Sequence, residues 1–220
     1  MEDRFASEWA QLPAPWRTAL ELSWEGFRVG SPPVGAVVID RAGDVIAQGR
    51  SRRYEASAPR GELAGSRVAH AEINALAAVP VDSTEGLWLY VTLEPCFLCT
   101  AAAAISHVSG VSFAGSDPIW RFLEDIGRFH PELQRRSFQR RGPMQGPIGA
   151  WATLLPLIER VRRDPGGRRI DAFDTRGGEL VQYARDLVKA GHADELMVMS
   201  LDTAISSIWP DLIKLASSVP

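Results

Sequence analysis

The run LWLYVTL at residues 87–93 is apolar almost throughout and is rich in aromatic and branched side chains. Such a run is typical of a β-strand, and a strand that is apolar on both faces needs cover on both faces. Pro95 follows directly, and proline fits the first turn of a helix because its missing N–H is not needed there. This stretch therefore predicts a central strand that leads into a helix over about residues 95–106.

The preceding and following segments alternate between helical and strand patterns. Apolar residues recur at helical spacing from Leu12 to Phe27 and predict a first helix. The polar segment at 51–67, which contains Pro59, predicts a long loop. The remaining elements are a hairpin at 34–39 and 45–49, a helix at 69–79 and a strand at 108–115. This alternation predicts a layered α/β domain.

Beyond residue 117 the pattern weakens. Residues 136–141 could form a fifth strand, 148–162 a helix and 163–169 a linker, and 179–190 predicts a helix that ends at Gly191. We therefore expect a domain at 1–162, followed by a mainly helical C-terminal extension at 163–220 that caps the site or extends a dimer interface.

Charge and hydropathy narrow the classes of partner. The formal net charge is -3, but residues 120–169 hold eleven Arg, no Lys and five acids. That segment could contact phosphate, although a solvated face explains it as well. No stretch approaches the roughly 20 apolar residues of a membrane helix, and the start of the chain is polar and acidic. We expect a cytoplasmic protein without a membrane partner.

The two cysteines of the chain, Cys96 and Cys99, stand in a C-x-x-C pattern, and His70 and Glu72 open the helix predicted before the central strand. One imidazole and two thiolates are three ligands suited to tetrahedral zinc, with the fourth position left for water, which is the catalytic arrangement. A thioredoxin-like redox pair is the alternative for C-x-x-C. It leaves the H-x-E pair unexplained, so we interpret His70, Cys96 and Cys99 as ligands of Zn²⁺.

The role of Glu72 follows from the chemistry such a centre supports. Zinc lowers the pKa of bound water to about 7, so hydroxide is present at neutral pH and can add to a ring carbon that bears an amino group. Ammonia leaves only after it has been protonated, and Glu72 lies close enough to carry that proton without being a ligand. Glu72 is therefore the candidate catalytic residue.

The pattern H-x-E…P-C-x-x-C is typical of zinc deaminases. The segments PVGAVVI (33–39), AHAEINAL (69–76) and LYVTLEPCFLC (89–99) resemble the cytidine deaminase-like superfamily, nearest its tRNA adenosine deaminase and guanine deaminase branch. The resemblance covers about residues 10–117 and implies a three-layer α-β-α sandwich around a mixed five-stranded sheet. It also implies that Val34, Ala36 and Glu94 line the substrate pocket.

Three more residues are candidates for substrate contact. Ser51 stands where many relatives of this kind carry Asn, and its shorter side chain lacks the paired donor and acceptor of an amide. Phe97 lies between the two cysteines, and Trp120 lies just past the fourth strand, where a ring could stack. For each of the two aromatic residues, packing is the alternative interpretation.

We expect hydrolytic removal of an exocyclic amino group, as ammonia, from a nucleobase, nucleoside or related aminated heterocycle. One alternative is deamination of adenosine in tRNA, which the acidic net charge and the missing Asn disfavour. Another is a catalytically silent subunit of the same fold. A small-molecule substrate and a homodimer are the expected partners, with nucleic acid possible but not favoured.

Overall fold

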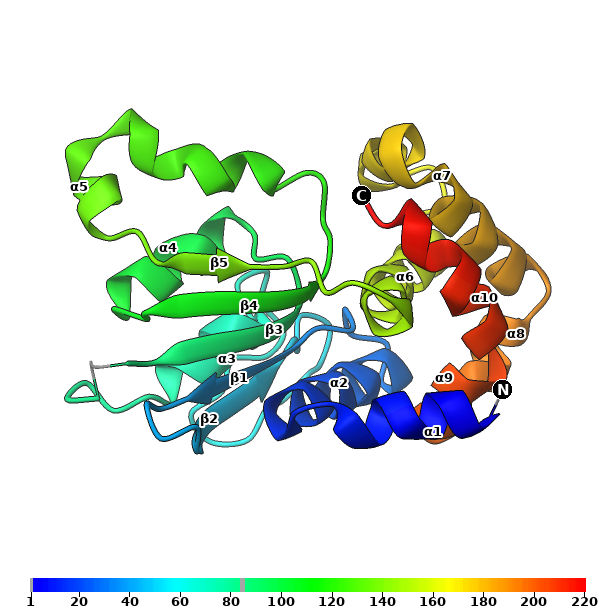
Figure 1. The fold of residues 1–220 in the computed structure, drawn as a ribbon, viewed down its shortest axis with the longest axis horizontal. Coiled ribbons are helices and arrows are strands. Elements are labelled where there is room, and N and C mark those ends of the chain that lie inside the picture. Colours follow the sequence, from blue (N-terminus) through cyan, green and yellow to red (C-terminus); the bar gives the residue numbers. More distant parts are fainter. Residues whose placement is uncertain (1, 84–85) are drawn as a thin grey trace.

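The computed structural model describes residues 2–83 and 86–220. A mixed five-stranded sheet forms the centre of one half of the molecule (Figure 1), with strand order β2-β1-β3-β4-β5. Strand β1 runs antiparallel to β2 and β3, whereas β3, β4 and β5 run parallel to one another. The strands are β1 (Gly35–Ile39), β2 (Val45–Arg50), β3 (Trp88–Leu93), β4 (Gly110–Gly115) and β5 (Gln139–Arg141).

Helices cover both faces of this sheet. On one face α2 (Ala14–Arg28) lies so close to β1 that a Cβ on Gly35 would be 2.1 Å from the carbonyl oxygen of Ala19. On the other face α3 (Ala71–Ala77) lies against β2, where a Cβ on Gly49 would be 2.5 Å from the amide nitrogen of Ala75. Side chains would separate these layers, so both glycines are needed for the close approach.

Two further helices complete the layers. Helix α4 (Phe97–Ile105) packs beside α3, and α6 (Pro147–Arg163) packs on β4 on the same side as α2. The sequence-based expectation of a three-layer α/β sandwich with a mixed five-stranded sheet is confirmed.

A second group of helices forms the other half of the molecule (Figure 1). Helices from both ends of the chain share one apolar core with α2 and α6, and Phe5 packs edge to face on Trp209 at a centroid distance of 5.1 Å. The elements are α1 (Glu2–Gln11), α7 (Arg168–Lys189), α8 (His192–Met197), α9 (Leu201–Ser207), α10 (Trp209–Leu215) and η2 (Ala216–Ser218). The C-terminal extension is helical, as expected, while a boundary at 162/163 stays a prediction.

The structure adds elements that the sequence patterns did not indicate: helix α1, the 3₁₀ segment η1 (Arg121–Phe129) and the short α5 (Pro131–Arg135). The predicted linker at 163–169 is shorter, because α7 begins at Arg168. Helix α7 has non-helical backbone angles at Gly177, and two adjacent glycines there explain why the pattern predicted a helix only from Glu179. No helix among the described residues is long and apolar enough to cross a membrane.

Candidate metal centre and active site

The candidate zinc ligands converge where two helices begin. His70 is the N-cap residue of α3, Cys96 is the N-cap residue of α4, and Cys99 lies in the first turn of α4. His70 Nδ1 is 3.5 Å from Cys96 Sγ and 3.3 Å from Cys99 Sγ, and the two sulfurs are 3.5 Å apart. Tetrahedral zinc with its usual bond lengths would hold such atoms roughly 3.5–3.8 Å apart. The donor set therefore fits zinc in both chemistry and spacing, as the sequence predicts.

The two thiols titrate very differently. The hydrogen bond with Cys99 is the main cause that lowers the pKa of Cys96 to about 4, and His70 adds to it. The same hydrogen bond and its burial raise the pKa of Cys99 well above its usual value. The pKa of His70 is raised, chiefly by its hydrogen bond to Cys96. The metal-free centre therefore contains one thiolate, at Cys96, ready to bind a cation.

This difference predicts selective alkylation of the metal-free protein. At pH 7 iodoacetamide should modify Cys96, which is partly exposed, much faster than the buried Cys99. Because Cys96 gains a proton as the pH falls through about 4, its reaction should be lost below that pH. Peptide mass spectrometry measures both sites, and Zn²⁺ should protect them. Equal modification of the two cysteines would contradict the assignment of the thiolate.

Glu72 lies beside this cluster without belonging to it. Its side chain is buried, and burial is the main cause that raises the pKa of its carboxyl group to about 6, with the Cys96 thiolate as the second. A carboxyl group with this pKa can both take up and release a proton near neutral pH. Glu72 therefore has the position and the acidity that a proton carrier needs.

A small cavity of about 60 Å³ opens at the cluster. Four of the six residues proposed for substrate contact line this cavity: Val34, Ser51, Glu94 and Trp120. Glu72, His70 and Cys96 line it as well.

Two of the proposed substrate contacts lie elsewhere. Ala36, the second residue of β1, is fully buried in the core between the sheet and α3 and does not line the cavity. Phe97 is 55% exposed and lines a separate cavity between α4, η1 and α5. These two residues therefore do not line the metal cavity.

Three charged lining residues were missed: Arg53, Asp117 and Arg160. Glu94 follows β3 and Asp117 follows β4, and the Asp117 amide donates to Glu94 Oε2 at 3.1 Å. Side chains after the carboxyl ends of neighbouring parallel strands lie together, so the strand pattern could have indicated Asp117. Arg160 comes from α6, and no local pattern indicates it.

Both buried carboxylates at this edge are paired with arginine. Arg140 of β5 donates to Glu94 Oε1 at 3.1 Å, and Arg160 donates to Asp117 Oδ2 at 2.9 Å. These pairs neutralise acids that would otherwise be buried alone at high cost. They also fix the wall of the cavity that faces α6.

The loop at 51–67 forms the opposite wall. Arg50 and Arg52 bind Glu55, and Arg52 also binds Glu62. Asn74 of α3 accepts from the Leu63 amide at 2.8 Å and donates to the Arg50 carbonyl at 3.0 Å. The loop is thus ordered by ion pairs and tied to the helix that carries His70 and Glu72.

The fold and the ligand cluster together define a candidate zinc-binding domain. Comparison with known families agrees: residues 12–114 match the cytidine and deoxycytidylate deaminase zinc-binding region. This part of the chain, slightly less than half of it, is therefore similar to that family.

Two curated relatives share this region. One is a tRNA-specific adenosine deaminase of Haemophilus influenzae, which is 38% identical to this chain over 105 residues. The match covers 46% of this chain and 56% of the relative. The other is the riboflavin biosynthesis protein RibD of Corynebacterium ammoniagenes, which is 37% identical to this chain over 110 residues. The match covers 46% of this chain and 29% of the relative. The chain thus spans about half or less of the length of these relatives.

A solved structure of guanine deaminase from Nitrosomonas europaea has the same fold. It covers 68% of this chain and 86% of its own, with a TM-score of 0.50 and 23% sequence identity.

Proposed function

We propose that the protein is a zinc-dependent hydrolytic deaminase that releases ammonia from an aminated heterocycle of the nucleobase or nucleoside class. The observation that carries the proposal is the placement of buried Glu72 beside three ligand atoms that lie within 4.8 Å of one another. A structural zinc site normally has four protein ligands, whereas three leave a position for water.

The reaction needs few groups from the protein. When bound by His70, Cys96 and Cys99, zinc supplies hydroxide at neutral pH by lowering the pKa of water to about 7. Glu72 accepts the proton of the attacking water and passes it to the ring nitrogen. It then takes the proton of the hydroxyl group now bonded to the ring carbon and delivers it to the amino group, so that the C–N bond breaks, a carbonyl forms and ammonia leaves. Val34 and Trp120 offer apolar surface for the ring.

The direct test is ammonia release by the zinc-loaded protein from a panel of bases, nucleosides, nucleotides and aminated triazines. We expect turnover of at least one member, and its loss after the metal is removed by a chelator, because the three ligands then hold no metal to activate water. Full zinc occupancy with no ammonia from any member would contradict the proposal and favour a silent subunit of the same fold.

Adenosine in tRNA is the second candidate substrate, and the similarity to tRNA-specific adenosine deaminases favours it. A base in RNA would have to be flipped out to reach a centre of this kind. Ser51 argues against a shared mode of binding, because its hydroxyl is 3.4 Å from the Ala69 carbonyl oxygen and lacks the reach of an amide. Conversion of adenosine to inosine in a tRNA transcript measures this activity.

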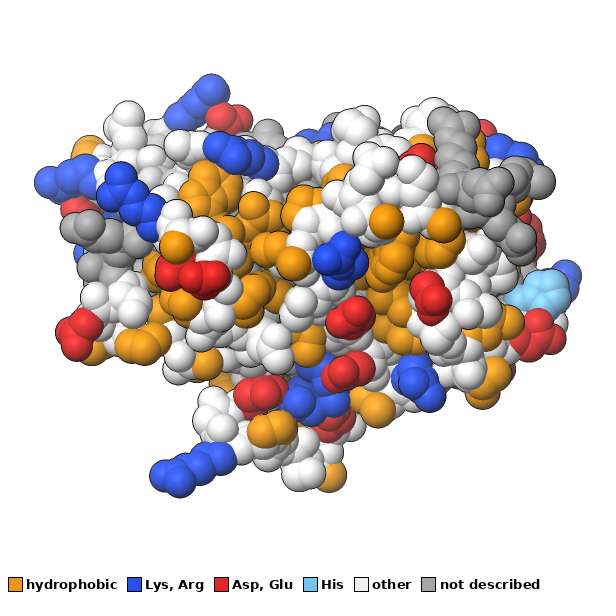
Figure 2. Space-filling view, turned by 60° about the horizontal axis from the view of Figure 1, so that its bottom comes forward, with side chains coloured by type: hydrophobic (Ala, Val, Ile, Leu, Met, Phe, Trp, Pro, Cys, Tyr) orange, Lys and Arg blue, Asp and Glu red, His pale blue; other side chains and the backbone are white. Residues whose placement is uncertain are grey.

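Self-association remains part of the proposal. Phe97, Ile105 and Phe129 expose 55%, 67% and 76% of their surface, and the face drawn in Figure 2 has a band of apolar side chains broken by single charges. Exposed apolar area of this kind favours an interface, and sedimentation velocity would reveal a homodimer or a monomer.

We also propose the cytoplasm as the compartment, because free thiols that bind a metal persist where thiols are kept reduced.

A further inference from the structure

A second, larger cavity adjoins the metal cavity. Its volume is about 350 Å³, and the two cavities share Pro32, Val34, Arg53, Leu93 and Arg160. The metal cavity alone, at about 60 Å³, is far below the roughly 300–1,000 Å³ of typical small-molecule sites. A substrate that places its ring at the metal therefore extends into the larger cavity.

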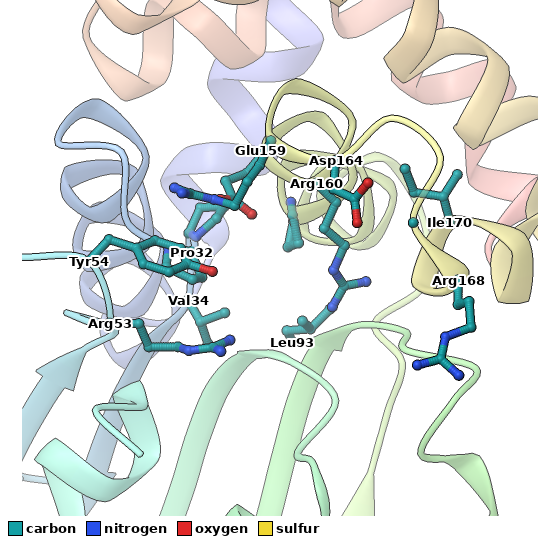
Figure 3. A pocket seen from close by; sticks show the side chains of 14 residues that line it. Pro32, Val34, Arg53, Tyr54, Leu93, Glu159, Arg160, Asp164, Arg168 and Ile170 are labelled. Carbon is teal, nitrogen blue, oxygen red and sulfur yellow. The ribbon is translucent and has the colours of Figure 1, made fainter. Parts of the chain in front are cut away.

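The outer wall of the larger cavity comes from residues that follow the segment at 12–114 that matches the deaminase family. Helix α6 contributes Glu159, Arg160 and Arg163, and the turn into α7 contributes Asp164 and Arg168. Figure 3 shows Arg53 and Arg160 extending toward Val34 and Leu93 from opposite sides, with Arg168 beyond Ile170. Four arginines against two acids give this lining an excess of positive charge.

One of these arginines already has partners within the protein. Arg163 binds Glu159 at 2.6 Å, donates to the Gly30 carbonyl at 2.7 Å and stacks 3.6 Å from the ring centre of Tyr54. That pairing also neutralises Glu159. Arg160 is already paired with Asp117, so among the described residues the charge of this cavity that has no ion-pair partner rests on Arg53 and Arg168, with Asp164 as the opposing acid.

Two of the three remaining arginines have donors with no acceptor. Arg160 uses one terminal nitrogen on Asp117, and its other terminal nitrogen is buried without a partner among the described residues. The Nε of Arg53 is likewise buried without one. Buried donors are almost always paired in native proteins, so two at one junction indicate a ligand with acceptor oxygens. The N-terminal end of α7 at Gly167 adds a field that favours an anion.

We propose that this cavity binds the phosphate of a mononucleotide whose aminated ring lies at the metal. The inference rests on the deaminase function proposed above and narrows its substrate class to nucleoside monophosphates. Arg53 and Arg160 hold the phosphate at the junction of the two cavities, and Arg168 approaches it from α7. The C-terminal extension thereby becomes part of the substrate site.

Calorimetric titration tests the inference without turnover. Zinc-loaded Glu72→Gln protein is titrated with cytidine and CMP, adenosine and AMP, and guanosine and GMP. We expect one monophosphate to bind roughly 10- to 100-fold more tightly than its nucleoside, because charge-assisted hydrogen bonds to phosphate are worth about 1.5–3 kcal/mol. Arg53→Gln and Arg168→Gln should each reduce this ratio toward one.

Arg162→Gln is the matched control, because Arg162 lies on α6 but binds Asp194 at 2.6 Å outside the cavity, and it should leave the ratio unchanged. The inference is overturned if every monophosphate binds no better than its nucleoside, if the cavity variants keep the ratio, or if only an RNA oligonucleotide binds. A phosphate-dependent ratio without ammonia release by the wild type would uphold the subsite and reject the deaminase function. Ammonia release with equal use of nucleosides and monophosphates would do the reverse.

Discussion

Glu72→Gln is expected to lower kcat by roughly 10²–10⁴-fold while the protein keeps its zinc. Glutamine has the size of glutamate but cannot take up the proton of water or return it to the leaving amine. The side chain is buried and lies outside the ligand set, so its exchange should leave the three ligands in place. Steady-state ammonia release on the best substrate gives kcat, and metal analysis gives the zinc content.

Glu21→Gln is a suitable control for that variant. It makes the same chemical change on an exposed part of α2, and we expect kcat within about a factor of two of the wild type, since exposed substitutions away from the site have small effects. If Glu72→Gln kept both its zinc and more than half of the wild-type kcat, another group would have to carry the proton.

The chemistry of the site could be predicted because its ligands lie in short local patterns. His70 and Glu72 are two residues apart, and Cys96 and Cys99 are three apart, so each pair is positioned by the first turn of one helix. The fold then needs only to bring two helix starts together. The alternation of strands and helices on either side predicts that arrangement as well.

The substrate side of the site could not be predicted in the same way. Arg160 meets Asp117 from 43 residues away, and Arg140 meets Glu94 from 46 residues away. Both arginines lie in the arginine-rich segment at 120–169, for which the sequence left a phosphate contact and a solvated face open. The structure divides that segment: Arg135 is exposed beside Glu132, whereas Arg160 lines both cavities.

Ala36 and Phe97 lie away from the metal cavity for a related reason. A motif indicates which segment lies near a site, but it does not indicate which way each side chain points. Val34 and Ala36 are two residues apart and pack against the same core cluster, yet only Val34, which comes just before β1, reaches the cavity. Phe97 opens α4 beside Cys96, yet it faces η1 and α5.

Truncation after Arg163 is expected to abolish cooperative folding. Helices α7 and α10 pack on α6, and the shared core includes Trp24, Phe27, Trp151 and Leu154. Each large apolar side chain left in water costs about 1.5–3 kcal/mol, and several together exceed a typical stability of about 5–15 kcal/mol. The fragment should therefore be insoluble or unfold without a cooperative transition in differential scanning calorimetry.

A point variant grades the same effect within the full chain. Trp209 is 2% exposed in this core, and Trp209→Ala should cost about 3–5 kcal/mol and lower Tm strongly. Val198→Ala, at a position that is 81% exposed, should change stability by less than about 0.5 kcal/mol.

A fragment ending at Arg163 that bound zinc and unfolded cooperatively would show that the deaminase region folds alone, and the predicted division at 162/163 would then be a true domain boundary. Failure of the fragment, with rescue by co-expressed residues 164–220, would instead make the extension part of one cooperative unit, as the shared core with α2 and α6 predicts.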